Sequence, residues 1–261
     1  MISVVLPVYN QLGLTRACLE SLRGTSEPFE LCIVDNASTD GTAEFFRTAA
    51  LPVARRYHRN ADNVGLIRAL NQGAALAGGD VLCFLHNDTE MRDVRWLARL
   101  RAALDEPGVG LAGLYGARRL RADGRYVGRT LVHALEAGGN LRDDVTEVAA
   151  VDGVCLALRR EVLDAVGGFD EGYGFFHGYD RELSFAVREA GHRCVVVNTP
   201  FVHRGGGTRT GAAAPVKSAA DLGQRRAALD RFAGRWRHRL PADVRGARER
   251  VADWLTARAR P

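Results

Sequence analysis

Three polar residues, His86, Asn87 and Asp88, directly follow the apolar run of residues 81–85. An unbroken apolar run of this length is typical of a strand that is buried on both faces of a parallel sheet. Open α/β sheets bind ligands at the carboxyl ends of their strands, so a phosphate-bearing substrate and a divalent cation would be held here. The carboxylate of Asp88 suits Mg²⁺ or Mn²⁺, and the imidazole of His86 favours Mn²⁺. Taken alone, the segment fits an ordinary turn after a strand equally well.

Two other strand ends carry side chains that could recognise a nucleotide. Pro7 and Tyr9 end the predicted strand 2–8, and Asp35 follows the predicted strand 29–34. The ring of Tyr9 could stack on a base, and the carboxylate of Asp35 could accept a hydrogen bond from a base N–H group. Singly, Asp35 is as well explained as a turn or helix-cap residue. Polar groups at three strand ends along one sheet edge together favour a nucleotide site.

Strand and helix patterns alternate over the first third of the chain. Short apolar runs predict strands at residues 2–8, 29–34 and 81–85, and residues 53–58 are predicted as a further strand. Apolar spacing and the residues typical of helix ends predict three helices between these strands. The first is 12–22, the second runs from a Ser38 or Thr39 cap through Phe46, and the third is 66–76, which Gly78 and Gly79 close. This alternation implies right-handed crossovers and therefore an α/β fold with a Rossmann-like, mostly parallel sheet flanked by helices.

The pattern loosens beyond residue 89. Residues 115–147 have no clear period and predict either a hairpin or a mobile loop. The remaining apolar runs predict helices at 94–104, 160–166 and 182–190. They also predict a strand at 109–114, two strands within 148–158 that are separated by a turn at Gly153, and a final strand at 194–197. Residues 205–215 are a flexible linker by composition.

The length and composition narrow the class of protein. The 261 residues are enough to bury one full α/β core. No apolar stretch approaches the roughly 20 residues that span a bilayer, and the start lacks the features of a signal peptide. We therefore expect a cytoplasmic protein. The five cysteines agree with this, because four of them lie in apolar, strand-like runs and are best explained as buried reduced thiols.

The formal charge of +5 is concentrated in the tail, where residues 216–261 contain 12 Lys/Arg and 5 Asp/Glu. No RNA- or DNA-binding signature accompanies this charge, so nucleic acid is not an expected partner. Two helical segments are predicted, separated by Pro241, and the first has one apolar face: Leu222, Leu229, Phe232, Trp236 and Leu240. This face could pack on the rest of the protein, rest peripherally on anionic lipid at the inner face of the membrane, or form a homodimer contact.

Six segments together resemble the family 2 glycosyltransferases of GT-A fold. They are VVLPVYN (4–10), IVDNASTDGT (33–42), NVG (63–65), GDVLCFLHNDT (79–89), VGGFDE (166–171) and HRGGGT (203–208). The resemblance covers roughly residues 2–210, and the combination in this order is highly specific. It implies a GT-A domain at 1–210, with a nucleotide-sugar half at 1–114 and an acceptor half at 115–210, followed by the helical tail at 216–261.

The resemblance implies an inverting transfer from a UDP- or dTDP-linked sugar to the hydroxyl of a glycan, lipid-linked or small-molecule acceptor. The family motifs assign the base and ribose to Pro7, Tyr9 and Asp35, with Asn63 and Arg68 nearby.

The resemblance also implies a metal site. Asp88 matches the metal-binding aspartate of the family's Asp-x-Asp motif, and His203, beside the triple glycine, matches the third metal contact. His86 stands where the family usually has Asp or Asn. This departure leaves open whether the ion is Mn²⁺ or Mg²⁺ and whether one is needed. The His86-Asn87-Asp88 version is similar to that of rhamnosyl and related transferases of surface polysaccharides.

The family's catalytic base is an aspartate in a Glu-Asp pair at the start of a helix, and Asp180 matches it. Tyr179 stands where Glu is common, and Glu182 is the next acidic residue. A base is needed because an acceptor hydroxyl must lose its proton as it attacks the anomeric carbon, and the helix dipole favours an ionised carboxylate. Alternatively, Asp180 could cap the N-terminus of the helix and take no part in catalysis. Asp152, Asp170 and Glu182 are candidates to bind sugar or acceptor hydroxyls.

Two alternatives to this interpretation stay open. A nucleotidyltransferase would need a Gly-rich loop bearing Lys or Arg after the first strand, which residues 10–13 do not supply. A non-catalytic sugar-nucleotide or polysaccharide binder is the other alternative, because of the departures at His86 and Tyr179. We predict a metal-assisted inverting glycosyltransferase with Asp180 as its base.

Overall fold

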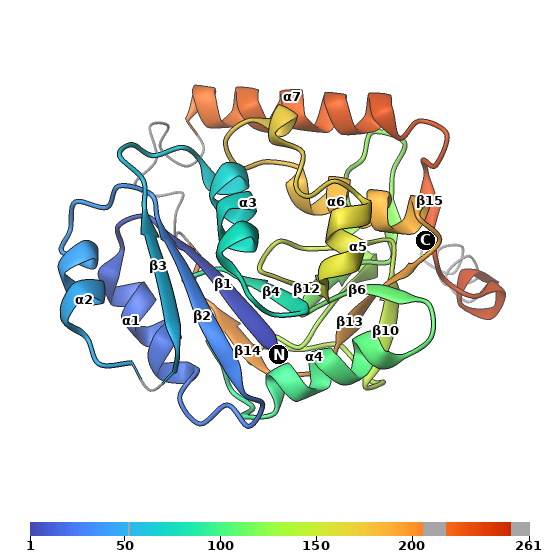
Figure 1. The fold of residues 1–261 in the computed structure, drawn as a ribbon. Coiled ribbons are helices and arrows are strands. Elements are labelled where there is room, and N and C mark those ends of the chain that lie inside the picture. The colour runs from blue at the N-terminus through green and yellow to red at the C-terminus, as the bar shows by residue number, and fades with distance from the viewer. Residues whose placement is uncertain (52, 206–217, 252–261) are drawn as a thin grey trace.

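An eight-stranded sheet forms the centre of the molecule, in the order β10-β13-β6-β12-β4-β1-β2-β3 (Figure 1). In this computed structural model, residues 1–51, 53–205 and 218–251 are described. The strands of the sheet are β1 (Ile2–Val8), β2 (Phe29–Asp35), β3 (Arg55–Arg59), β4 (Val81–Leu85), β6 (Val109–Gly113), β10 (Val145–Val148), β12 (Cys155–Arg159) and β13 (Arg193–Val197).

The half of the sheet that contains β1 is parallel, as the alternating pattern predicts. β1 pairs in parallel with both β2 and β4, and β2 pairs in parallel with β3. β12 runs antiparallel between β4 and β6, and β10 runs antiparallel to β13. The other strands share one direction, so the prediction of a mostly parallel sheet is confirmed.

Helices cover both faces of the sheet, and each face has its own apolar core. The helices are α1 (Leu12–Ser21), α2 (Thr42–Thr48), α3 (Leu66–Leu76), α4 (Trp96–Asp105), α5 (Arg160–Ala165), α6 (Tyr179–Glu189) and α7 (Ala219–Arg235). One core joins side chains of α1, α2 and α4, and the other joins those of α3, α5, α6 and α7 (Figure 1). β1 serves both cores because its side chains alternate: Val4 and Leu6 face the first core and Val5 faces the second.

The segment without clear periodicity, residues 115–147, forms short strands. β7 (Tyr115–Ala117), β9 (Leu131–His133) and β11 (Ala150–Val151) make one small sheet, and β8 (Arg119–Leu120) pairs with β15 (Ala242–Asp243). Strands of two or three residues carry too little alternation to be recognised in a sequence. For the same reason the prediction that 194–197 is the final strand was wrong, because β14 (Phe201–His203) follows and pairs with β5 (Thr89–Met91).

Two predicted helix-end signals were also wrong. α2 begins after Gly41, and the carboxylate of Asp40, in place of the expected Ser38 or Thr39, accepts hydrogen bonds from the backbone N–H and hydroxyl of Thr42. α3 ends at Leu76 with Ala77 in an extended conformation. Gly79 serves another purpose, which is close packing, because a side chain at position 79 would collide with the backbone of residues 1 and 3.

The tail packs on the sheet's second core through α7. The rings of Phe232 and Trp236 are buried, with centroids 4.8 and 5.6 Å from that of Phe185 in α6. This confirms the packing interpretation for the described part of the tail, except that Leu222 is 52% exposed and does not join the buried face. Residues 247–251 are helical, and the predicted linker lies, apart from residue 205, outside the described residues. The part of the chain that the structure describes contains no helix with the length and hydropathy of a membrane span.

Candidate active site

A cavity of about 320 Å³ lies between the carboxyl ends of β1 and β4 and the helices α6 and α7. Seven of the residues predicted from the sequence to form the site line it: Pro7, His86, Asn87, Asp88, Asp152, Asp180 and His203. They come from five separate parts of the chain and meet because a parallel sheet brings strand ends together at one edge. The cavity therefore brings most of the predicted site residues into one space.

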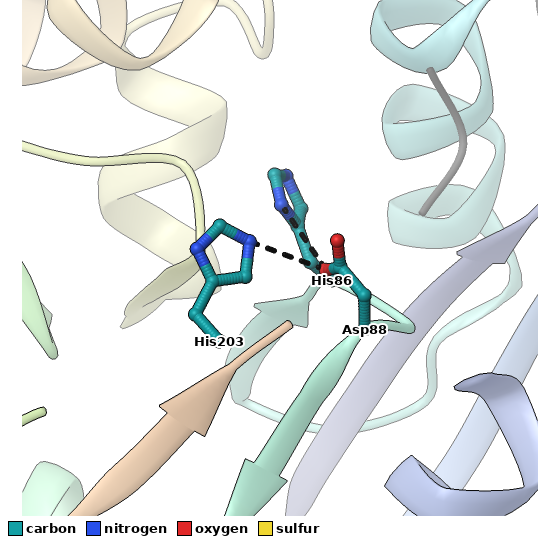
Figure 2. A group of neighbouring side chains, drawn as sticks. All are labelled: His86, Asp88 and His203. Atoms are coloured by element: carbon teal, nitrogen blue, oxygen red, sulfur yellow. Dashed lines mark ion pairs between the residues drawn. The ribbon is translucent and has the colours of Figure 1, made fainter. Parts of the chain in front are cut away.

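Three of these side chains form a group that could hold a divalent cation (Figure 2). His203 Nε2 lies 3.3 Å from Asp88 Oδ1, His86 Nδ1 lies 4.0 Å from the same oxygen, and all three ligand atoms lie within 4.8 Å of one another. Two imidazole nitrogens and one carboxylate oxygen fit a first-row transition ion such as Mn²⁺ better than Mg²⁺, which prefers oxygen ligands.

The pairing of β5 with β14 positions His203 in this group. In the antiparallel register His203 lies opposite Thr89, and the backbone N–H of Arg204 donates to the carbonyl of Asp88 at 2.9 Å. Asp88 itself is 4% exposed in the turn after β4, where its neighbour Asn87 donates to Thr15 Oγ1 at 2.9 Å. The two segments are 115 residues apart in the sequence, and this short ladder brings them together.

The hydroxyl of Tyr179 holds the ring of His86. His86 Nε2 lies 2.9 Å from this hydroxyl. The hydroxyl also donates a hydrogen bond to the carbonyl of Gly153, at 3.4 Å. A hydroxyl has one proton to donate, so we assign that proton to the carbonyl of Gly153 and the proton of the imidazole to Nε2. Nδ1 then carries the lone pair on the side of Asp88. The two positions at which the sequence departs from the family pattern, 86 and 179, are therefore hydrogen-bonded to each other.

Asp180 stands in the first turn of α6, on the wall of the same cavity. Its helix begins after Gly178, whose φ of 82° is a left-handed conformation that favours glycine. Its side chain is 10% exposed, and its carboxylate accepts a hydrogen bond from the Tyr126 hydroxyl at 3.3 Å and lies 3.5 Å from the Arg181 guanidinium. That guanidinium is centred 4.0 Å from the centre of the Tyr126 ring. Asp180 is thus held by two partners while it borders the cavity.

Electrostatics distinguish two other groups in the cavity. Burial, and next the negative charge of Asp180, raise the pKa of Asp152 to about 6. Burial acts to lower the pKa of His203, but the hydrogen bond and the charge of Asp88 outweigh it, so the pKa is raised overall. Carboxylates crowded into one partly closed space are costly without cations, which is typical of a site that binds a positive ion or transfers a proton.

Four residues predicted to bind the base and ribose do not line the cavity. Tyr9 is half-buried at the end of β1. Asp35 is fully buried, and its carboxylate accepts hydrogen bonds from the Tyr57 hydroxyl, Arg59 and the backbone of residue 38. The side chain of Asn63 accepts from the backbone N–H of residue 65, and Arg68 pairs with Glu171 at 3.1 Å. Tyr9 and Asn63 follow β1 and β3, Asp35 is the last residue of β2, and Arg68 lies in the first turn of α3. Their binding roles stay predictions.

Asp170 and Glu182, predicted to bind sugar or acceptor hydroxyls, contact the tail outside the lining of the cavity. Asp170 lies 2.9 Å from Arg231 of α7. Glu182 is 4% exposed and accepts a hydrogen bond from Trp236 Nε1 at 2.7 Å, with Arg235 Nε at 3.0 Å. Asp170 thus holds α7 from the segment between α5 and α6, and Glu182 holds the end of α7 on α6, a structural role that explains both residues without a ligand.

Several residues of the site were not predicted from the sequence. The tail helix α7 contributes Arg225, Leu229 and Phe232 to the cavity wall, and His177 and Arg181 flank Asp180. The arginines and the apolar face of the tail were visible in the sequence. Nothing in the spacing of the tail indicates which surface of the sheet it covers.

Comparisons with known proteins agree with the geometry. A family model described as Glycosyl transferase family 2 matches residues 3–167. The chain is similar to a PGL/p-HBAD biosynthesis glycosyltransferase of Mycobacterium tuberculosis, with 37% identity over 41% of this chain and 42% of that protein. It is also similar to the O-antigen biosynthesis protein RfbC of Myxococcus xanthus, with 31% identity over 82% of this chain and 18% of that protein. It therefore spans less than half the length of either relative.

Solved structures give the fold. The mannosyltransferase PcManGT from Pyrobaculum calidifontis, solved with GDP-Man and Mn²⁺, superposes with a TM-score of 0.61 over 87% of this chain and 60% of its own, at 21% identity. At this level of identity the likeness defines the architecture, which is the GT-A fold.

Proposed function

Because the chain belongs to glycosyl transferase family 2, we propose that it transfers a sugar from a nucleoside-diphosphate sugar to an acceptor hydroxyl, with inversion at the anomeric carbon. The observation that carries this proposal is the single cavity lined by Asp180 and by the group of His86, Asp88 and His203. A proton acceptor and a set of metal ligands that border one space are the two parts that such a transfer needs.

Asp180 is the general base in this proposal. The acceptor hydroxyl approaches the anomeric carbon, and as the new C–O bond forms, the proton of the hydroxyl passes to the Asp180 carboxylate. The bond between the anomeric carbon and the diphosphate oxygen breaks in the same step, so the configuration inverts without a covalent enzyme intermediate. Arg181 and the Tyr126 hydroxyl hold the carboxylate in one orientation, which such a step requires.

The other end of the cavity receives the diphosphate. A bound Mn²⁺ or Mg²⁺ would supply positive charge against the charge that grows on the leaving diphosphate. His86, Asp88 and His203 would hold it, and Tyr179 keeps the His86 nitrogen turned toward it. Asp152 lies close enough to Asp180 for the charge of Asp180 to raise the pKa of Asp152, and Asp152 is the candidate to bind a hydroxyl of the sugar.

The donor and the acceptor are proposed by class. We propose a UDP- or dTDP-linked sugar as donor, with Pro7, Tyr9 and Asp35 on the base and ribose side. The acceptor belongs to the glycan, lipid-linked or small-molecule class, and the similarity to an O-antigen biosynthesis protein supports a role in surface polysaccharide synthesis. Such acceptors would be met at the cytoplasmic side of a membrane.

A donor screen tests the proposal. The protein is incubated with UDP-, dTDP- and GDP-sugars, with and without Mn²⁺, and free nucleoside diphosphate is assayed. We expect Mn²⁺-dependent release with one donor. NMR of a transferred product should show the anomeric configuration opposite to that of the donor. Binding of a donor without any release or transfer, at any Mn²⁺ concentration and with a broad panel of acceptors, contradicts the proposal.

A further inference from the structure

A second cavity, of about 600 Å³, adjoins the first one and continues away from the metal ligands. Its lining shares Arg181, Arg225 and Leu229 with the first cavity, and it contains none of His86, Asp88 or His203. One wall is α7. The other is the turn after β8, closed by a hydrogen bond from the backbone N–H of residue 121 to the carbonyl of residue 125 at 2.9 Å. Neither α7 nor this turn contains a residue that is assigned to the nucleotide or to the metal.

The lining of this cavity is basic. Four arginines and two aspartates contribute to it: Arg125, Arg181, Arg225, Arg226, Asp123 and Asp230. Both aspartates are only loosely paired, with separations of 3.6 Å between Arg125 and Asp123 and 4.0 Å between Arg226 and Asp230, on well-exposed side chains. Surface pairs of this kind contribute little and rearrange easily. Arg225 makes no ion pair with any residue that the structure describes.

Arg181 connects this cavity to the base. Its side chain is 16% exposed, and its Nε is buried without a hydrogen-bond partner among the described residues. A buried guanidinium N–H group without an acceptor is costly unless a ligand supplies one. Because the diphosphate of the donor belongs with the metal ligands, the basic cavity is left to the other substrate, whose hydroxyl must reach Asp180.

We propose, on the basis of the proposed function, that the acceptor carries a phosphate group and that Arg225, Arg226 and Arg125 bind it. A phosphate suits this cavity better than a carboxylate does, because its oxygens point in several directions. Guanidinium groups on α7 and on the facing turn can then contact it from both sides. The acceptor lies across Arg181, with its phosphate in the basic cavity and its hydroxyl at Asp180.

The test uses the full chain without divalent cations, so that phosphate has no metal to bind. Inorganic phosphate is titrated at constant ionic strength, with binding followed by calorimetry or by ³¹P NMR. We expect saturable binding that weakens by about tenfold or more in Arg225→Gln/Arg226→Gln, because one charge-assisted hydrogen bond corresponds to roughly that factor. The matched control is Arg237→Gln/Arg250→Gln, which removes the same charge from the tail outside the cavity.

Two results overturn the proposal: unchanged phosphate affinity in Arg225→Gln/Arg226→Gln, or an equal loss in the control, which would mean a diffuse charge effect. Sedimentation with phosphatidylglycerol vesicles separates the two sources of phosphate. Vesicle binding that depends on Arg225 and Arg226 assigns a lipid-borne phosphate, and phosphate binding without vesicle binding assigns a soluble acceptor. Mn²⁺-dependent binding of nucleoside diphosphate to the parent protein is measured separately, so failure of the proposed function would be seen independently of the phosphate site.

Discussion

Removing the hydroxyl of Tyr179 should weaken metal binding without unfolding the protein. In the assignment given above, this hydroxyl accepts a hydrogen bond from Nε2 of His86 at 2.9 Å and donates its own proton to the carbonyl of Gly153. In Tyr179→Phe the ring stays in its buried place against Phe169, but the imidazole loses its acceptor. The proton can then move to Nδ1, which removes the lone pair that faces Asp88.

The size of the expected loss of Mn²⁺ affinity follows from the lost hydrogen bond between Tyr179 and His86. Partners of metal-binding histidines typically contribute 10- to 100-fold to metal affinity, or roughly 1.4 to 2.7 kcal/mol. The distance of 3.4 Å to the carbonyl of Gly153 is long for a hydrogen bond, so the hydroxyl is not held as firmly as it could be. We therefore expect the lower end of the range, about a tenfold loss of Mn²⁺ affinity. The cost to folding should stay near 1 kcal/mol, the usual value of one hydrogen bond.

Two measurements check this prediction. The EPR signal of free Mn²⁺ gives the affinity, and ¹⁵N NMR of the histidine rings in the metal-free protein gives the tautomer of His86 directly. Tyr126→Phe is the control, because it removes a hydroxyl that donates to Asp180 and leaves His86 untouched. Gly153→Ala should act like Tyr179→Phe, since a side chain at position 153 would collide with the Tyr179 hydroxyl. Unchanged Mn²⁺ affinity in Tyr179→Phe, with Nε2 of His86 still protonated, would refute the reasoning.

Three further predictions concern single residues. Asp152→Asn should stabilise the metal-free protein by up to about 3 kcal/mol at pH 8, because the pKa of the parent carboxyl is raised from 3.8 to about 6 and its ionisation opposes folding by about 1.4 kcal/mol per pKa unit. This advantage should disappear in thermal melts as the pH falls through 6 toward 4, where the parent carboxyl is protonated; a pH-independent advantage contradicts it. Glu182→Gln should lower the free energy of unfolding in urea by about 2 kcal/mol, because charge-assisted contacts to Trp236 and Arg235 weaken; an unchanged midpoint contradicts the anchoring of α7. His203→Ala should reduce Mn²⁺ affinity measured by EPR at least tenfold, since one of three ligands is lost; equal affinity would exclude the residue as a ligand.

Three strands of the parallel half of the sheet, β1, β2 and β4, could be predicted from the sequence because each is an apolar run that ends in polar or turn residues. β3 is different, because its sequence RRYHR is exposed along its whole length. β1 and β4 match the predicted ranges fully, and three strand ends meet at one edge as expected. The predictions that were wrong concern short strands and the local geometry of helix ends. β5 and β14 have three residues each, and the start of α2 depends on which of several adjacent polar side chains reaches the backbone.

The site itself was only partly predictable. His203 was assigned beside Asp88 through the family resemblance, and the β5–β14 ladder gives the physical reason for their contact. The contact between His86 and Tyr179 spans 93 residues, so no spacing rule could indicate it. The same holds for α7: an amphipathic pattern tells which face is buried, but it does not name the surface that buries it.

The most direct test of the account is a comparison of the parent protein with Asp180→Asn, using the donor that the screen identifies. Transfer is followed with a working acceptor, and donor and Mn²⁺ affinities are measured in the same samples. We predict that transfer falls by 10²- to 10⁴-fold, the usual contribution of a general base, while both affinities stay within about twofold. Transfer at the parental rate by a folded Asp180→Asn variant would contradict the assignment of this cavity as the active site.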